Sequence, residues 1–290
     1  VYFTNLVHPL TLKETRLMMN VRNLILLSCV SSYAFAAVAD GKPYSVPVDA
    51  DYPKSVYWGD THLHTRNSAD AYSLGNMNLS PADAFRFAQG QELIAHNGMR
   101  VQLRRPLDFL VVSDHAEYLG GYYRFNVGDS LVTETSAGKQ WQGYLEEGDP
   151  VKLIAAFTAS MSDPENNYPF PEKVRRLIWE DVAITADEHN KPGRFTAFTG
   201  YEWTSMIEGN NLHRVVVYKD GADKTTQLPP FSGQDSLDPR ELWKALARYE
   251  EATGGEVMAI AHNGNISNGM MFPSVSVDGK KINRAYAELR

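Results

Sequence analysis

Short runs of apolar, β-branched and aromatic residues recur along the chain, separated by longer segments of mixed polarity. The runs occupy residues 56–58, 107–112, 194–198, 215–218 and 257–260. Runs of this length and composition are typical of strands that are buried on both faces. Four of them lead directly into a histidine or a carboxylate, and the run at 215–218 instead begins just after His213.

Helix signals separate the predicted strands. Ser80-Pro81 and Asp238-Pro239 each combine an N-cap residue with proline at the first helical position. The helix that begins at Pro239 should end near Gly254, where a glycine can terminate it. A third helix is predicted from Pro171 to about His189, because apolar residues recur along one side of that segment.

Alternation of strands and helices predicts an α/β fold with a parallel sheet. In such sheets and barrels, active-site groups lie at the carboxyl ends of the strands. Because four separate runs carry a metal-capable residue at that end, we expect these residues to form one shared site.

The first 36 residues have the order of features of a secretory signal. A short basic segment follows Met18, an apolar stretch comes next, and small-residue cleavage sites end at Ala36 and Ala39. We therefore expect export to the periplasm or the extracellular space. A short buried helix is the alternative interpretation, and a lipoprotein signal with a modified Cys29 fits less well.

Residues 37–290 are expected to form one domain. A polar segment around 126–170 interrupts the pattern, either as a lid or substrate-selecting insertion or as a surface elaboration. Residues 282–290 have the pattern of the start of a further element, which indicates that the domain is truncated at its C-terminus.

Composition narrows the function. The 290 residues are 43% hydrophobic and 22% charged, with a net charge of -7, which is ordinary for a folded protein and unfavourable for gripping nucleic acid. No apolar run reaches the ~20 residues that span a bilayer, so we expect no membrane attachment after signal cleavage.

Cys29 is the only cysteine, which excludes a disulfide within the chain and a zinc site built on several cysteines. A metal site would have to use His, Asp, Glu or Asn.

His62 and His64 are the strongest local signal. In an extended chain, residues two apart point the same way, so both imidazoles can reach one cation. Asp114 and His115 follow the second run, where the carboxylate could orient a ring and take part in catalysis. Glu202, between two aromatic residues after a buried strand, could bridge two cations. The alternatives are surface histidines for His62 and His64, an ordinary strand-end turn for Asp114 and His115, and a structural salt bridge for Glu202.

The later candidates are less specific. His213 and His262 each adjoin an apolar run and could also be core histidines. Asn263 could assist through its carbonyl, and Arg66 and Arg214 could hold an anionic substrate or form surface salt bridges. The three remaining histidines are excluded as metal ligands. His8 lies upstream of the proposed start, His96 lies in a turn and His189 lies at the end of a helix.

Two sets of motifs carry a family resemblance. Gly59-Asp60-Thr61-His62-Leu63-His64-Thr65, Ser68-Ala69-Asp70 and Ser113-Asp114-His115 resemble the first motifs of the PHP superfamily, the polymerase and histidinol phosphatase type. The segments at 105–110, 114–118, 212–214 and 262–269 resemble more closely a PHP-related bacterial family catalogued as domain of unknown function DUF3604. This resemblance covers residues 51 to 290.

The resemblance implies a distorted (β/α) barrel with several metal ions at the strand ends. No Asp-x-His follows His262, although PHP enzymes have this motif, so we expect the barrel to be incomplete in this chain. Glu202 resembles the bridging carboxylate. The complete set of predicted metal ligands is His62, His64, Asp70, His115, Glu202, His213 and His262.

Five histidines and several carboxylates exceed the ligands of one catalytic zinc, which favours two or three divalent ions of Mn, Zn or Fe. Clustered cations suit displacement at phosphorus and generate hydroxide from bound water. We therefore predict a secreted hydrolase that uses a metal-bound hydroxide on a small anionic phosphoester. An amidohydrolase acting on C–N or C–O bonds and a non-catalytic metal- or ligand-binding protein are the alternatives. The oligomeric state is not encoded in any pattern that we recognise.

Overall fold

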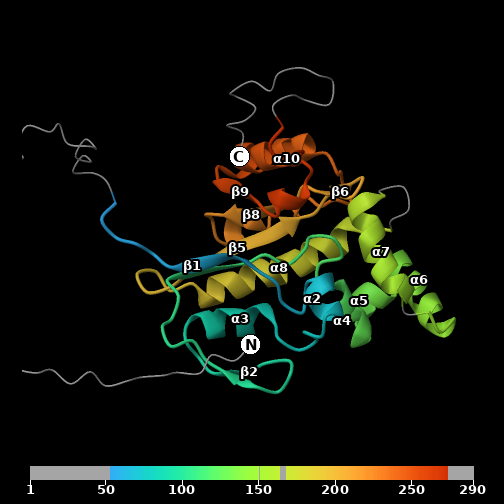
Figure 1. Cartoon of the computed structure of the whole chain (residues 1–290), viewed down its shortest axis with the longest axis horizontal. Coiled ribbons are helices and arrows are strands. Elements are labelled where there is room, and N and C mark those ends of the chain that lie inside the picture. Colours follow the sequence, from blue (N-terminus) through green and yellow to red (C-terminus); the bar gives the residue numbers. More distant parts are fainter. Residues whose placement is uncertain (1–52, 150, 164–167, 274–290) are drawn as a thin grey trace, which may run out of the picture. The chain divides into compact units, whose positions relative to one another are not determined.

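Five strands of the described residues form one sheet in the order β1-β4-β5-β8-β9. The structure is a computed structural model, and it describes residues 53–149, 151–163 and 168–273 (Figure 1). The chain divides into two units, Val1–Ser55 and Val56–Arg290, and all the elements below belong to the second. The sheet strands are β1 (Gly59–Leu63), β4 (Phe109–Val112), β5 (Thr196–Trp203), β8 (Arg214–Tyr218) and β9 (Val257–Ala261).

Two short hairpins and several helices complete the unit. The hairpins are β2 (Leu93–Ile94) with β3 (Arg100–Val101), and β6 (Met206–Ile207) with β7 (Asn210–Asn211). The helices are α2 (Ala69–Ser73), α3 (Pro81–Ala88), α4 (Gly121–Asn126), α5 (Ser130–Thr133), α6 (Ser136–Glu146), α7 (Val151–Ser162), α8 (Glu172–His189), α9 (Ala222–Thr225), α10 (Pro239–Thr253) and the 3-10 helix η2 (Gly264–Ile266).

The three helices that the sequence predicts are confirmed. Ser80 caps α3 through a reciprocal pair of hydrogen bonds with Asp83, and Asp238 caps α10. Gly254 ends α10 in the left-handed conformation, with φ +63°, which glycine adopts without the cost of a Cβ clash.

The sheet is mixed, so the expectation of a parallel sheet is wrong for one strand. β1, β4 and β5 are parallel, whereas β8 runs antiparallel to both β5 and β9. Residues 204–213 connect β5 to β8 through a hairpin, and this link is shorter than the dozen or more residues that a parallel crossover needs. The short connection therefore forces the chain to reverse.

The sheet curls into a half-barrel whose outer face carries helices. Phe85 of α3 packs against Phe195 beside β5, and Trp179 of α8 packs against Tyr201 and Tyr218. In Figure 1, α8 lies along one side of the sheet and α10 lies beyond β9. These contacts bury the outer face in the main apolar clusters of the unit.

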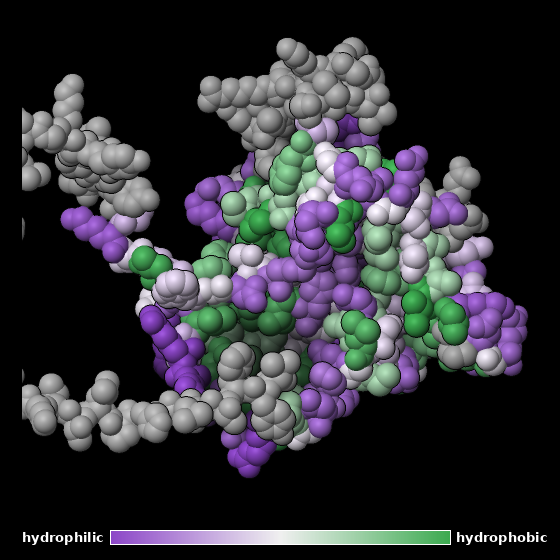
Figure 2. Space-filling model, viewed as in Figure 1, coloured by the Kyte–Doolittle hydropathy of each residue, from purple (hydrophilic) through white to green (hydrophobic). Residues whose placement is uncertain are grey.

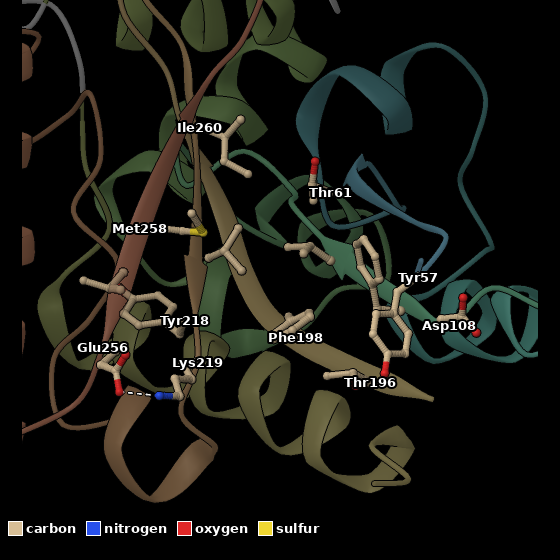
Figure 3. Close-up of a pocket in the computed structure, with 14 residues that line it drawn as sticks. Tyr57, Thr61, Asp108, Thr196, Phe198, Tyr218, Lys219, Glu256, Met258 and Ile260 are labelled. Carbon is tan, nitrogen blue, oxygen red and sulfur yellow. Dashed lines mark hydrogen bonds and ion pairs between the residues drawn. The ribbon is translucent and has the colours of Figure 1, made fainter. Parts of the chain in front are cut away.

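The inner face of the half-barrel borders an open, mainly apolar cavity of about 680 Å³. Residues of β1, β4, β5, β8 and β9 line it, and Figure 3 shows Thr61, Phe198, Met258 and Ile260 around the hollow. The curled sheet therefore has one covered face and one hollow face.

The segment around 126–170, expected to be polar, contains α5, α6 and α7. Their inward side chains are buried, including Val132, Trp141 and Phe157, and Trp141 stacks on Tyr122 of α4 at 4.8 Å between ring centroids. Residues 164–167 lie outside the described ranges.

The predicted signal segment and the element expected at 282–290 also lie outside the described residues. Within the described ranges, no helix combines the length and apolar character needed to cross a membrane.

Candidate metal centre

Each predicted ligand in or next to strands β4, β5, β8 and β9 continues an inward-facing row of side chains. Alternate residues of a strand share one face. Val111 and His115, Phe198 and Glu202, Val217 and His213, and Ile260 and His262 are separated by even numbers of residues. The apolar members of these pairs line the cavity, and the polar members stand at its rim. Because β8 is antiparallel, His213 at its start lies at the same edge as the ends of β5 and β9, and His262 N donates to His213 O at 3.1 Å.

A β-bulge directs the first histidine pair to the same place. The register of β1 against β4 shifts between Asp60 and Leu63, which inserts one extra residue in β1. Thr61 lines the cavity, and after the shift His62 and His64 lie at the rim, with their Nε2 atoms 3.0 Å apart. The predicted convergence of these two imidazoles is therefore present in the structure.

Glu202 is the centre of the cluster, and its side chain is 1% exposed. Its Oε2 lies 2.9 Å from both His62 Nε2 and His64 Nε2, and 3.8 Å from His115 Nδ1. Its Oε1 lies 2.9 Å from His213 Nδ1 and 3.6 Å from His262 Nε2. Five histidines thus surround one carboxylate.

Asp70, the first-turn acid of α2, joins the cluster on the far side of His64. Its Oδ1 lies 3.1 Å from His64 Nδ1, and its Oδ2 lies 3.5 Å from His115 Nε2. All seven predicted ligand side chains are therefore brought together, although they span residues 62 to 262.

The carboxylates control the charge of the cluster. Burial lowers the pKa of His64, but the hydrogen bonds that its ring donates to the Asp70 and Glu202 carboxylates outweigh this effect and raise it to about 10. Burial raises the pKa of Glu202, yet its histidine partners hold that pKa well below the usual range. Burial lowers the pKa of His262 to about 4, so this ring is neutral near pH 7.

The donor set fits divalent metal ions. Two groups have their ligand atoms within 4.8 Å of one another: His62, Glu202 and His262, and His64, His115 and Glu202. His213 Nε2 is buried and has no hydrogen-bond partner among the described residues, so a lone pair or a proton on this atom is left unsatisfied there. Imidazole nitrogens with a carboxylate favour Zn, Mn or Fe over the oxygen-rich sites of Mg or Ca.

The side chains of Asp114 and Arg214 do not join the cluster. Each is adjacent in sequence to a predicted ligand, and adjacent residues of a strand face opposite sides of the sheet. Asp114 accepts hydrogen bonds from the backbone N–H and the hydroxyl of Thr65, so it anchors the loop after His64 and makes no hydrogen bond to a ligand ring. The Arg214 side chain is buried against the Trp243 ring and donates to the Leu212 and His213 carbonyl oxygens. In the structure both side chains therefore contact the backbone and side chains that hold the predicted ligands, and their catalytic and substrate-binding roles stay predictions.

The structure places Arg66 away from the cluster and Asn263 beside it. Arg66 stacks on the Tyr123 ring at 3.7 Å and donates to Asn78 O, in a separate recess that none of the seven predicted ligands lines. The Asn263 side-chain nitrogen lies 3.0 Å from His262 Nε2, at the cluster. Among the predicted substrate-binding residues, Asn263 is the one placed beside the cluster.

Three buried residues beside the cluster were not predicted. Ser68 contacts His64 and Asp70, and Thr204 contacts His115 Nδ1 through its hydroxyl. Glu117 is fully buried, accepts from the backbone N–H groups of Thr204 and Gly233, and lies 4.0 Å from His115 Nδ1. Glu117 has the same even spacing from His115 that joins the other inward residues, which is the signal that could have identified it.

The cluster lies outside the cavity on the inner face of the sheet. None of the seven predicted ligand side chains lines this 680 Å³ hollow, whose walls are mainly apolar. On the face shown in Figure 2, hydrophilic residues gather in a band across the middle, in the region that β5 and β8 occupy in Figure 1. The predicted ligand cluster and the mainly apolar hollow are therefore two separate features of the half-barrel.

Comparison with known sequences gives one match. The family described as "Protein of unknown function (DUF3604)" matches residues 51–290. The chain matches no curated protein and no solved structure.

Proposed function

The chain belongs to the DUF3604 family, and we propose that it is a metal-dependent hydrolase that acts on phosphoesters. One observation carries the proposal: Glu202 is shared by two groups of histidines that each have the spacing of a metal site. A buried carboxylate between two such groups is suited to bridge two divalent ions.

The chain's own residues divide into two sets around Glu202. His62 and His262 would hold one ion with Glu202 Oε1 or Oε2, and His64 and His115 would hold the other. Asp70 and His213 stand beside these sets and would complete them. Bound divalent ions of Mn, Zn or Fe would supply Lewis acidity and an activated water at neutral pH.

Side chains around the ions would bind and orient the substrate. His262 stays neutral near pH 7 because of its burial, so it is ready to ligate without losing a proton. The Asn263 amide beside it can donate hydrogen bonds to a phosphoryl oxygen. Asp114 contributes indirectly, since it fixes Thr65 in the loop that carries His64.

The wider expectations belong to the same proposal. The half-barrel, the His-x-His pair at the end of its first strand and the bridging glutamate support a PHP-type barrel. We further propose that the protein is exported and that its substrate is a small anionic phosphoester. The acidic net charge of -7 is consistent with a small substrate in place of nucleic acid.

The test is metal analysis followed by a hydrolysis panel. The wild-type chain should bind about two ions of Zn, Mn or Fe and hydrolyse phosphomonoesters or phosphodiesters in their presence. Glu202→Gln should lose at least one ion and the activity, because the neutral amide cannot bridge two cations.

Glu117→Gln is the matched control, since Glu117 is also fully buried but is held by backbone N–H groups. It should keep its metal. A wild-type chain that binds no metal, or that cleaves amides but no phosphoester with its metal bound, would contradict the proposal.

A further inference from the structure

Ser68 lies between the two loops that carry His64 and His115. It precedes α2, and it is fully buried. Its hydroxyl has three polar neighbours: Asp70 Oδ1 at 2.6 Å, His64 Nδ1 at 2.9 Å and the backbone nitrogen of His115 at 3.2 Å. One small side chain thus touches three predicted metal ligands.

The hydrogen-bonding capacity of a hydroxyl fixes the direction of each bond. Serine has one O–H donor and two acceptor lone pairs. The ionised Asp70 carboxylate can only accept, so it takes the hydroxyl proton. The backbone N–H of His115 can only donate, so it occupies one lone pair. The remaining lone pair faces His64 Nδ1 and requires a proton on that nitrogen.

A proton on Nδ1 determines which atom of His64 faces the cluster. With Nδ1–H directed to Ser68 and Asp70, Nε2 is the nitrogen that can ligate an ion once its own proton is released. That atom lies 2.9 Å from Glu202 Oε2 and 3.0 Å from His62 Nε2. The orientation therefore presents Nε2 to the place where an ion would sit.

We propose that Ser68 is a positioning residue that sets the His64 ring for ligation through Nε2 and ties it to the backbone of His115. This inference rests on the proposed metal centre. An outer hydrogen-bond partner of this kind fixes the tautomer and orientation of a ligand histidine before the metal arrives. Ser68 also links β1 to β4, so its loss would loosen two ligands together.

The first experiment compares zinc affinities by chelator competition on the full chain. Ser68→Ala should bind zinc about tenfold more weakly than wild type, as is usual when an outer partner of a ligand is removed. Ser68→Thr, which keeps the hydroxyl, should recover most of the affinity.

Ser113→Ala is the matched control. Ser113 is also fully buried at the β1–β4 junction, but among the described residues its hydroxyl forms hydrogen bonds only with the backbone of Leu63. It should keep wild-type zinc affinity. Equal losses in the two alanine variants, or an unchanged affinity in Ser68→Ala, would overturn the role of Ser68 while leaving the metal centre intact.

The second experiment needs no variant. In the zinc-loaded wild-type chain, ¹⁵N NMR should show His64 with a protected Nδ1–H and a zinc-shifted Nε2. Ligation of His64 through Nδ1 would refute the inference directly. A wild-type chain that binds no zinc would overturn the metal centre, and the inference with it.

Discussion

At the scale of single residues, the metal-free cluster keeps a proton on a histidine nitrogen that would have to offer a lone pair to a metal ion. His64 is hydrogen-bonded on both ring nitrogens by carboxylates, which raise its pKa to about 10 against the opposing effect of burial. The protonated ring stabilises the metal-free fold below its unfolded pKa of ~6.5. This contribution to stability is lost only as the pH rises through the pKa of about 10 that His64 has in the folded protein. Metal ions must therefore compete with a proton at neutral pH.

Zinc binding should release at least one proton per chain at pH 8. His64 is still protonated there, whereas a histidine with an ordinary pKa would be only roughly 3% protonated. Affinity should then rise about tenfold per pH unit up to the pKa of His64. Calorimetry in two buffers of different ionisation enthalpy measures the number of protons released, and a value near zero at pH 8 would refute this charge assignment.

Arg66 illustrates how a side chain beside a motif can serve another part of the molecule. Its guanidinium is occupied by Tyr123 and by the Asn78 carbonyl oxygen. We therefore expect Arg66→Ala to keep its metal and to change the KM for a phosphoester by less than about twofold. Asn263→Ala, at the cluster, should raise KM while keeping the metal. Steady-state kinetics on both variants would contradict this assignment if Arg66→Ala showed the larger increase.

At the scale of elements, the site depends on close contact between strands β4, β5 and β8. Gly200 lies in the inward row of β5 between Phe198 and Glu202. A Cβ at this position would lie 2.5 Å from Val111 Cγ1 and 2.7 Å from Val216 O. The absence of a side chain at Gly200 thus lets three strands approach and keeps Glu202 at the rim.

Gly200→Ala should lower the free energy of unfolding by about 1–3 kcal/mol, because the methyl group overpacks the junction. Gly143→Ala in α6 is the opposite case, since a Cβ there meets nothing within 4 Å. It should leave the stability unchanged or raise it by up to ~1 kcal/mol. Urea unfolding measures both, and equal effects would show that strand spacing does not limit this position.

At the scale of the whole molecule, the ligands come from segments that only the folded chain brings together. His62 and His262 lie at the two ends of the described sheet in sequence, yet their ring centroids are 3.8 Å apart. The unfolded chain has no comparable site, so a metal that binds the cluster should stabilise the fold.

Zinc at about 100 times its dissociation constant should raise the free energy of unfolding by ~2.7 kcal/mol. Glu202→Gln should show a much smaller increase, since it lacks the shared carboxylate. Denaturant titration with and without zinc provides the measurement. Equal stabilisation of wild type and variant would indicate that zinc binds elsewhere.

The sequence by itself determined the three predicted helices, the strand runs and which residues are candidate metal ligands. These are local properties: Ser80-Pro81 caps a helix wherever it occurs, and His62 and His64 are two apart in an extended chain. The sequence alone did not show where the side chains of Asp114 and Arg214 lie. Each is adjacent in sequence to a predicted ligand, and neighbours in a strand point to opposite faces. Neither side chain therefore lies with the cluster at the rim.

Only the tertiary structure decided how the segments meet. The reversal of β8 depends on the short hairpin connection, and it explains why His213 precedes its strand while His115 and His262 follow theirs. The bulge in β1, the hydroxyl of Ser68 between two loops and the separate recess of Arg66 likewise depend on contacts between distant segments. Such contacts leave no periodic pattern in the chain, because they are fixed by packing and by the hydrogen bonds that buried polar groups must complete.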